Sequence, residues 1–121
     1  MKRVLHDYLK DILDAINDIE NFVKDIDYNL FTLDHMRRNA VVRSLEIIGE
    51  ASKSIPEELR NQYNNIPWKR MVGMRDKLIH AYFGVDYESV WAVAKERIPE
   101  IKQPLEKMIK EQSEIEKHQQ T

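Results

Sequence analysis

The stretch LHDYLKDILDAINDIENFVKDI, Leu5 to Ile26, carries a regular apolar pattern. Its aliphatic residues follow one another at alternating steps of four and three: Leu5, Leu9, Ile12, Ile16, Ile19, Val23 and Ile26. That spacing places them on one stripe of an α-helix, and a period near 3.5 favours shallow, bundle-like crossing. The stretch therefore predicts a long helix of about six turns packed against other helices.

A second helix is predicted to begin near Thr32 or Asp34 and to reach about Lys53. Its inward positions are small or aliphatic, which favours close packing: Ala40, Val41, Ser44, Leu45, Ile48 and Ala51. Gly49 lies inside this helix, where it costs roughly 1 kcal/mol relative to Ala. We therefore expect another part of the molecule to approach its backbone closely. Alternatively, Gly49 is a tolerated residue beside a solvated row of charges: Arg43, Glu46 and Glu50.

Further helices are predicted downstream. Pro56 opens the short segment PEELRNQY at a first-turn position that needs no N–H. The next helix is expected from Trp68 to about Phe83, and Asp86 is expected to cap the one after it. Pro99 and Pro104 lack a backbone donor, so they should kink or restart the last helix. No alternating strand pattern, repeat or Gly-rich loop is present.

Length and composition set the class of protein. The 121 residues are 42% hydrophobic and 33% charged, which predicts one soluble domain, 1–121, with a polar tail, 111–121, that is expected to fray. The expected fold is an all-α, up-and-down bundle of four to five helices. Because the chain has no cysteine, disulfides, thiolate metal sites and cysteine nucleophiles are excluded.

The charge and the N-terminus bear on partners and location. The formal charge is −2, so any affinity for nucleic acid must come from a local patch. The start, MKRVLHDYLKDILDAIND, interrupts its apolar residues with charges, so neither a signal peptide nor a membrane span is expected. We expect a cytoplasmic protein that does not associate with membranes.

The stretch GMRDKLIHAYFG, Gly73 to Gly84, brings an arginine, a histidine and a tyrosine together. Arg75 shares its helical row with apolar and aromatic residues: Trp68, Val72, Ile79 and Tyr82. Its guanidinium is therefore either snorkelling, paired with an acid, or facing a shared interface. Asp76 precedes His80 by four residues, so its carboxylate is expected to hydrogen-bond the imidazole and fix its tautomer.

The spacing of Arg75 and His80 bears on the assembly. The two side chains are about 140° apart on one helix, which is poor geometry for a site within one chain. Gly73 and Gly84 leave the row of His80 short of side-chain cover, open to a ligand or a second chain. A two-fold axis would bring both arginines and both histidines into one cleft. The motif thus predicts a homodimer.

An ordinary bundle explains the same residues without a site. In that interpretation Asp76 and His80 form a surface pair, while Arg75 makes a salt bridge to Glu46 or Glu50.

Other candidate residues also have two readings. The cations Lys69, Arg70 and Lys77 are either a phosphate-binding footprint or a solvated helix face. Trp68 and Trp91 are expected to anchor the core, with base stacking as the alternative. The remaining histidines show no metal-ligand spacing, so no metal site or cofactor is predicted: His6, His35 and His118.

Four blocks, read in order, resemble the HepT-like family of the HEPN superfamily. They are IIGEA at 47–51, IPW at 66–68, GMRDKLIHAY at 73–82 and VDYESVW at 85–91. The family comprises the toxin halves of bacterial and archaeal toxin-antitoxin pairs. The resemblance covers roughly half of the chain, with R-x4-H-x-Y at its centre.

The resemblance implies a helical homodimer with ribonuclease activity. Arg75 and His80 would lie in the dimer cleft, and Asp76 matches the polar position after the arginine. Tyr82 matches the tyrosine that a cognate minimal nucleotidyltransferase antitoxin modifies with AMP from ATP, which silences the toxin.

Such a site needs no bound metal, because RNA carries its own nucleophile, the 2′-OH. The ordinary pKa of an imidazole, about 6.5, suits either proton transfer. Arg75 would stabilise the extra charge on the phosphorane, and Asp76 would orient His80. Tyr82 would contact phosphate or stack on a base, and a nucleotide on its hydroxyl would block the cleft.

Three hypotheses follow. The chain is a metal-independent endoribonuclease toxin, or a binding module for a nucleotide or an antitoxin with little cleavage activity, or a dimerisation bundle whose motif is a structural salt-bridge network. The overall acidity favours the second.

Overall fold

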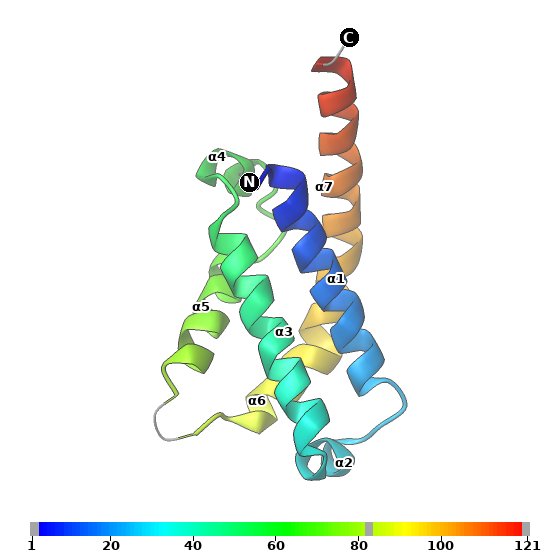
Figure 1. The fold of residues 1–121 in the computed structure, drawn as a ribbon, viewed down its shortest axis with the longest axis vertical. Helices are drawn as coiled ribbons and strands as arrows, with labels where there is room; N and C mark the ends of the chain where they lie inside the picture. Colours follow the sequence, from blue (N-terminus) through cyan, green and yellow to red (C-terminus); the bar gives the residue numbers. More distant parts are fainter. Residues whose placement is uncertain (1–2, 82–83, 120–121) are drawn as a thin grey trace.

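The computed structural model describes residues 3–81 and 84–119. Over these ranges the chain is helical and contains no strand: α1 (Leu5–Val23), α2 (Tyr28–Leu33), α3 (His35–Lys53), α4 (Glu57–Gln62), α5 (Trp68–Ile79), α6 (Tyr87–Ala92), the π-helical turn η1 (Val93–Arg97) and α7 (Ile98–Gln119). The four long helices α1, α3, α5 and α7 alternate in direction, so the predicted all-α, up-and-down topology is confirmed (Figure 1). The described ranges hold more helices than the four to five predicted, because three short helices of six residues each, α2, α4 and α6, add to the four long ones.

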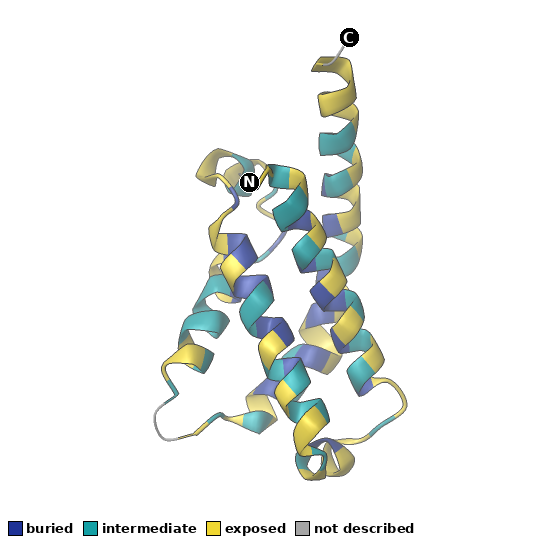
Figure 2. Ribbon diagram, viewed as in Figure 1, coloured by how far each residue is buried: buried dark blue, intermediate teal, exposed yellow. Residues whose placement is uncertain are grey.

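The core forms where the apolar stripe of α1 meets α3 and α7. Along this stripe Leu9, Ile12, Ile16 and Ile19 are at most 1% exposed. Figure 2 shows the buried residues of α1, α3 and α7 on the sides that face the middle of the bundle, whereas the last turns of α7 are exposed. Helix α1 ends at Val23, three residues earlier than its stripe predicts.

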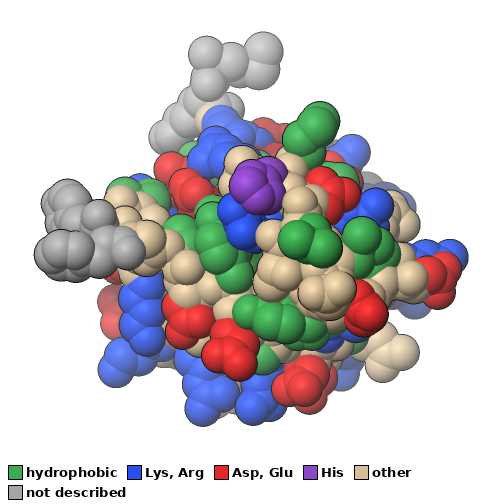
Figure 3. All heavy atoms as spheres, turned by 90° about the horizontal axis from the view of Figure 1, so that it is seen from below, with side chains coloured by type: hydrophobic (Ala, Val, Ile, Leu, Met, Phe, Trp, Pro, Cys, Tyr) green, Lys and Arg blue, Asp and Glu red, His purple; other side chains and the backbone are tan. Residues whose placement is uncertain are grey.

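Helix α2 is an element that the sequence pattern did not predict. Asp25 has a positive φ of 58°, which an aspartate tolerates better than most residues, and it turns the chain out of α1. The Asp27 carboxylate then accepts a hydrogen bond of 2.9 Å from the Leu30 N–H and caps α2. Phe31 is fully buried. The other side of α2 exposes Leu30 and leaves hydrophobic side chains on the end of the molecule seen in Figure 3.

The packing of α5 on α3 depends on Gly49, which is buried. A Cβ built there would overlap the Cβ of Arg75 and would lie 2.8 Å from the Met71 carbonyl oxygen. The close approach expected at Gly49 is therefore confirmed, and the approaching element is α5. Because α5 packs closely on α3 at this glycine, the contact fixes the position of the Arg75 Cβ, from which its side chain extends.

The last part of the chain changes its helical pitch. Asp86 caps α6 as predicted, accepting from the Ser89 N–H at 3.2 Å. The π-helical turn η1 then leads into α7, whose second residue is Pro99. A wider turn before a proline relieves the clash between its ring and the carbonyl four residues earlier, and α7 begins at Ile98, so the restart predicted for Pro99 occurs there. Pro104 lies inside α7, and residues 111–119 of the predicted tail are helical. Within the described residues, no helix has the length and apolar character to cross a membrane.

Candidate active site

Arg75 lies against α3 rather than in free solvent. Its Cβ and Cγ are among the three atoms that a Cβ built at Gly49 would meet first, and its side chain is 22% exposed. This position explains why an arginine can occupy an otherwise apolar row: its stem packs on α3 while its guanidinium reaches the helix edge.

Two carboxylates hold the Arg75 guanidinium. Nη1 donates to Asp76 Oδ1 at 3.1 Å, and Nη2 lies 3.7 Å from Glu50 Oε1. Of the two acids named from the sequence, Glu50 is the partner, whereas Glu46 lies 3.7 Å from Arg43. Both partner carboxylates of Arg75 are 49% exposed, so each pair is weak, and a phosphate could compete for the guanidinium.

One donor of Arg75 is unused. Its Nε is buried and has no hydrogen-bond partner among the described residues. A buried unsatisfied N–H is uncommon, so this edge of the guanidinium is a candidate position for a ligand or a partner group.

His80 caps the C-terminus of α5. The helix ends at Ile79, so the expected continuation to Phe83 is wrong: His80 has φ −99° and ψ 23° and leaves the helical conformation. The chain then passes Gly84, with φ +106°, toward the Asp86 cap. A glycine adopts that positive φ without strain, which lets the chain reverse between α5 and α6.

The imidazole contacts a backbone carbonyl, not the expected carboxylate. His80 Nδ1 lies 2.9 Å from the carbonyl oxygen of Asp76, which also accepts the His80 backbone N–H at 3.1 Å. A carbonyl can only accept, so this contact requires a proton on Nδ1 and leaves Nε2 of the neutral ring with its lone pair. The Asp76 carboxylate does not make the predicted contact because it is turned toward Arg75.

The outer side of α5 is lightly covered. A Cβ built at Gly73 would meet nothing within 4 Å, which agrees with the open row predicted there. Lys69, Arg70 and Lys77 are exposed, and none of the three forms an ion pair with another described residue. Tyr82, the predicted modification site, lies outside the described residues.

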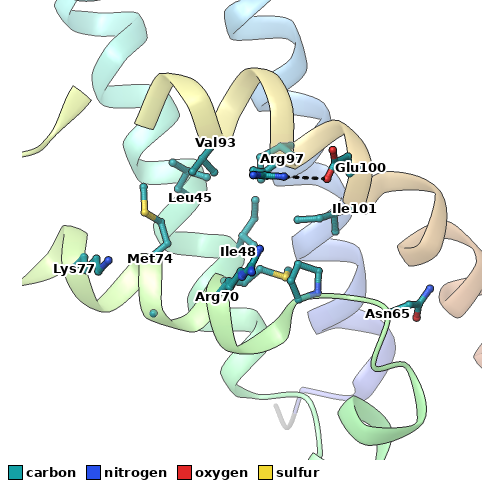
Figure 4. A pocket seen from close by; sticks show the side chains of 14 residues that line it. Leu45, Ile48, Asn65, Arg70, Met74, Lys77, Val93, Arg97, Glu100 and Ile101 are labelled. Carbon is teal, nitrogen blue, oxygen red and sulfur yellow. Dashed lines mark ion pairs between the residues drawn. The ribbon is translucent and has the colours of Figure 1, made fainter. Parts of the chain in front are cut away.

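A cavity of about 510 Å³ adjoins this side of α5 (Figure 4). Its floor is apolar and comes from four helical segments, α3, α5, η1 and α7: Leu45, Ile48, Met74, Val93 and Ile101 among others. Its edge carries Arg70, Lys77 and Arg97, and the last lies 3.8 Å from Glu100. Arg75 and His80 are not among the lining residues, so the cavity is separate from the motif, although α5 contributes residues to both.

Both tryptophans are core anchors. Trp68 is 5% exposed and donates its indole N–H to the Tyr63 carbonyl at 3.0 Å. Trp91 packs on the buried Phe31 ring, with ring centroids 5.1 Å apart.

The family model and the relatives that match this chain agree on one family. The family model described as "Ribonuclease HepT-like" matches residues 12–108. A Methanocaldococcus jannaschii protein named "Putative RNase" is 53% identical over 93% of this chain and 97% of its own length. "Probable ribonuclease HepT" of Thermococcus cleftensis is 51% identical over 91% of this chain and its own full length. No solved structure gives a significant match.

Proposed function

This chain belongs to the HepT-like ribonuclease family, and on that premise we propose that it is a metal-independent endoribonuclease, the toxin of a toxin-antitoxin pair. The observation that carries the proposal is the contact between His80 Nδ1 and the Asp76 carbonyl at 2.9 Å. It orients an exposed imidazole with Nε2 available for proton transfer. An imidazole held in one tautomer by a backbone acceptor is a usual form of a general base.

The chemistry is a transesterification within RNA. Nε2 of one histidine takes the proton of the 2′-OH, whose oxygen attacks the adjacent phosphorus and forms the 2′,3′-cyclic phosphate. A second imidazole, protonated, gives its proton to the leaving 5′-oxygen. Arg75 stabilises the additional negative charge on the phosphorane, for which a planar, permanently charged guanidinium is well matched.

The two proton transfers are best served by two histidines, so we propose a homodimer with a shared cleft. In one chain Arg75 leans on α3 while His80 caps the far end of α5, and no described cavity contains both. A second copy related by a two-fold axis would supply the missing arginine and histidine.

Asp76 is proposed as a positioning residue rather than the partner of the imidazole. Its carboxylate holds Arg75 at 3.1 Å, and phosphate binding would replace this exposed pair with stronger bidentate contacts. Lys69, Arg70 and Lys77, which form no ion pair with described residues, are proposed to contact RNA phosphates.

The proposed control of activity is covalent. A nucleotidyltransferase antitoxin would use ATP to attach AMP to Tyr82, two residues after His80. The added phosphate would repel RNA and the nucleotide would fill the cleft.

A second function is favoured by the electrostatics of the motif. Arg75 is neutralised by Asp76 and Glu50, and the whole chain has a charge of −2, so affinity for RNA is low unless these pairs open. In this alternative the protein is a nucleotide- or antitoxin-binding module that serves mainly as the partner's modification substrate.

The deciding experiment is RNA cleavage in EDTA by the purified protein, with Tyr82 verified as unmodified by mass spectrometry. His80→Ala should abolish cleavage, and His35→Ala, an exposed histidine at the start of α3, is the matched control. Products ending in 2′,3′-cyclic phosphate support the mechanism. If wild type and His80→Ala are equally inert on varied RNAs, the binding module is the better account.

A further inference from the structure

A second cleft, apart from the R-x4-H motif, opens between α4 and the first turn of α5. Its volume is about 620 Å³, and polar side chains form much of its wall: Glu57, Arg60, Asn61, Asn64, Lys69 and Arg70. Three of these residues are cations and one is an acid. The cleft therefore carries a local positive charge on a molecule that is acidic overall.

Two arginines in this cleft differ from all others in the chain. Six of the eight arginines have a side-chain partner, either an acid, a carbonyl or an aromatic ring: Arg3, Arg37, Arg38, Arg43, Arg75 and Arg97. Among the described residues, only Arg60 and Arg70 make no such contact, and both line the cleft.

Arg60 gives the stronger indication of a ligand. Its side chain is half-buried, and its Nε is buried without a hydrogen-bond partner among the described residues. Leaving a charged donor desolvated and unpaired is costly, so an acceptor normally occupies such a position. Two asparagine amides, Asn61 and Asn64, stand beside it in the cleft wall and can donate to the same acceptor.

The donor set suits a phosphate group. A guanidinium presents paired N–H donors that match two phosphate oxygens, and amide N–H groups complete such a site. Glu57 is the single acid in the cleft wall, so an anion meets little repulsion there.

The position along α5 favours RNA over a small anion. Arg70 lines both this cleft and the 510 Å³ cavity, and Lys77 lies with it on the edge of that cavity (Figure 4). Neither cation has an ion pair among the described residues, and Lys77 is seven residues closer to His80 along the chain. Between them, Gly73 leaves the helix backbone uncovered. From Arg70 to the end of α5 at Ile79 the helix spans about 14 Å, the length of roughly four stacked nucleotides, and His80 follows directly.

We propose that Arg60 and Arg70 form a phosphate-binding subsite that holds the RNA strand several nucleotides from the bond cleaved at His80. This inference rests on the proposed ribonuclease function, since it takes RNA as the ligand. The subsite adds affinity and sets the shortest RNA that binds well, whereas the motif performs the chemistry.

The test measures binding without cleavage. Fluorescein-labelled single-stranded RNA is titrated with the His80→Ala protein and with the same protein carrying Arg60→Gln and Arg70→Gln. Loss of two phosphate contacts should weaken binding at least about tenfold and reduce the slope of log K against log[salt] by about 1.4. The control Lys24→Gln/Lys107→Gln removes two exposed charges from the end of α1 and from α7, and should change affinity less than about twofold.

The Arg60 Nε–H resonance in NMR spectra provides a direct readout. It should shift when RNA is added to the His80→Ala protein. Should the double variant fail to fold, this resonance decides: an Arg60 Nε–H signal that does not move when RNA is added overturns the subsite.

Equal affinities for the arginine variants and their background protein would overturn the subsite. Separate cleavage assays distinguish the two proposals. For these assays the arginine substitutions are made in the wild-type protein, with His80 intact. If the wild type cleaves RNA, and Arg60→Gln/Arg70→Gln binds and cleaves as well as it does, the proposed function stands and the subsite is removed. A wild type that binds through the arginines but never cleaves removes the ribonuclease activity and keeps the subsite.

Discussion

Gly49→Ala tests the packing that positions Arg75. The new Cβ would overlap the Cβ of Arg75 and lie 2.8 Å from the Met71 carbonyl oxygen, where ordinary contact begins at 3.4 Å. Neither neighbour is the end of a flexible side chain, so α5 must move away from α3. Overpacking of this kind costs up to about 3 kcal/mol, and the higher helix propensity of alanine returns about 1, so the net loss should be about 2 kcal/mol.

The assay is urea unfolding followed by circular dichroism, with Gly73→Ala as the matched control. Both glycines lie inside long helices, but a Cβ at Gly73 meets nothing within 4 Å. Gly73→Ala should therefore stabilise the protein by about 0.5–1 kcal/mol. If the two substitutions change the free energy of unfolding by the same amount, α5 does not pack on Gly49, and the Arg75 side chain is not held against α3.

Three further outcomes are expected. Phe31→Ala should lower the free energy of unfolding by about 3–5 kcal/mol in urea titrations, because this ring on the inner side of α2 is fully buried. A loss below about 1 kcal/mol would contradict that burial. Hydrogen bonds from Arg37 lower the pKa of Asp34 from 3.8, and those from Ser89 lower the pKa of Asp86. Because both pKa values are depressed in the folded state, the stability from these caps is present at about pH 5 and is lost as the pH falls below 3.8. The free energy of unfolding of an Asp34→Asn/Asp86→Asn protein should therefore decline less steeply between about pH 5 and 3. Asp76→Asn should leave the imidazole tautomer unchanged in ¹⁵N NMR spectra, because the backbone carbonyl holds it; a tautomer change would show that the carboxylate matters after all.

Much of the fold could be read from the sequence because its signals are local. The four-three spacing of Leu9, Ile12, Ile16 and Ile19 predicts one buried helical stripe, and these residues are buried. Gly49 predicted a close approach because no other residue leaves room at the backbone. The family could be read too, since its four blocks occur in order.

The short helix α2 was missed for a physical reason. Six residues are too few to show a periodicity of 3.6, and the helix depends on the Asp27 cap and on burial of Phe31. The end of α5 was also misplaced. Residue types compatible with a helix continue past Ile79, but the chain leaves the helical conformation at His80.

The candidate site divides between sequence and tertiary structure in the same way. The sequence determined which side chains carry charge and which can transfer a proton, and the spacing of Arg75, Asp76 and His80 marked them as candidates. Only the tertiary structure decided their contacts. Asp76 turns its carboxylate to Arg75 and its carbonyl to His80, Glu50 rather than Glu46 completes the arginine's pairing, and Arg60 of α4 joins Arg70 of α5 in one cleft. The spacing of residues along one helix fixes the direction in which each side chain leaves that helix. A contact between two helices depends instead on how closely they pack and on where each one ends.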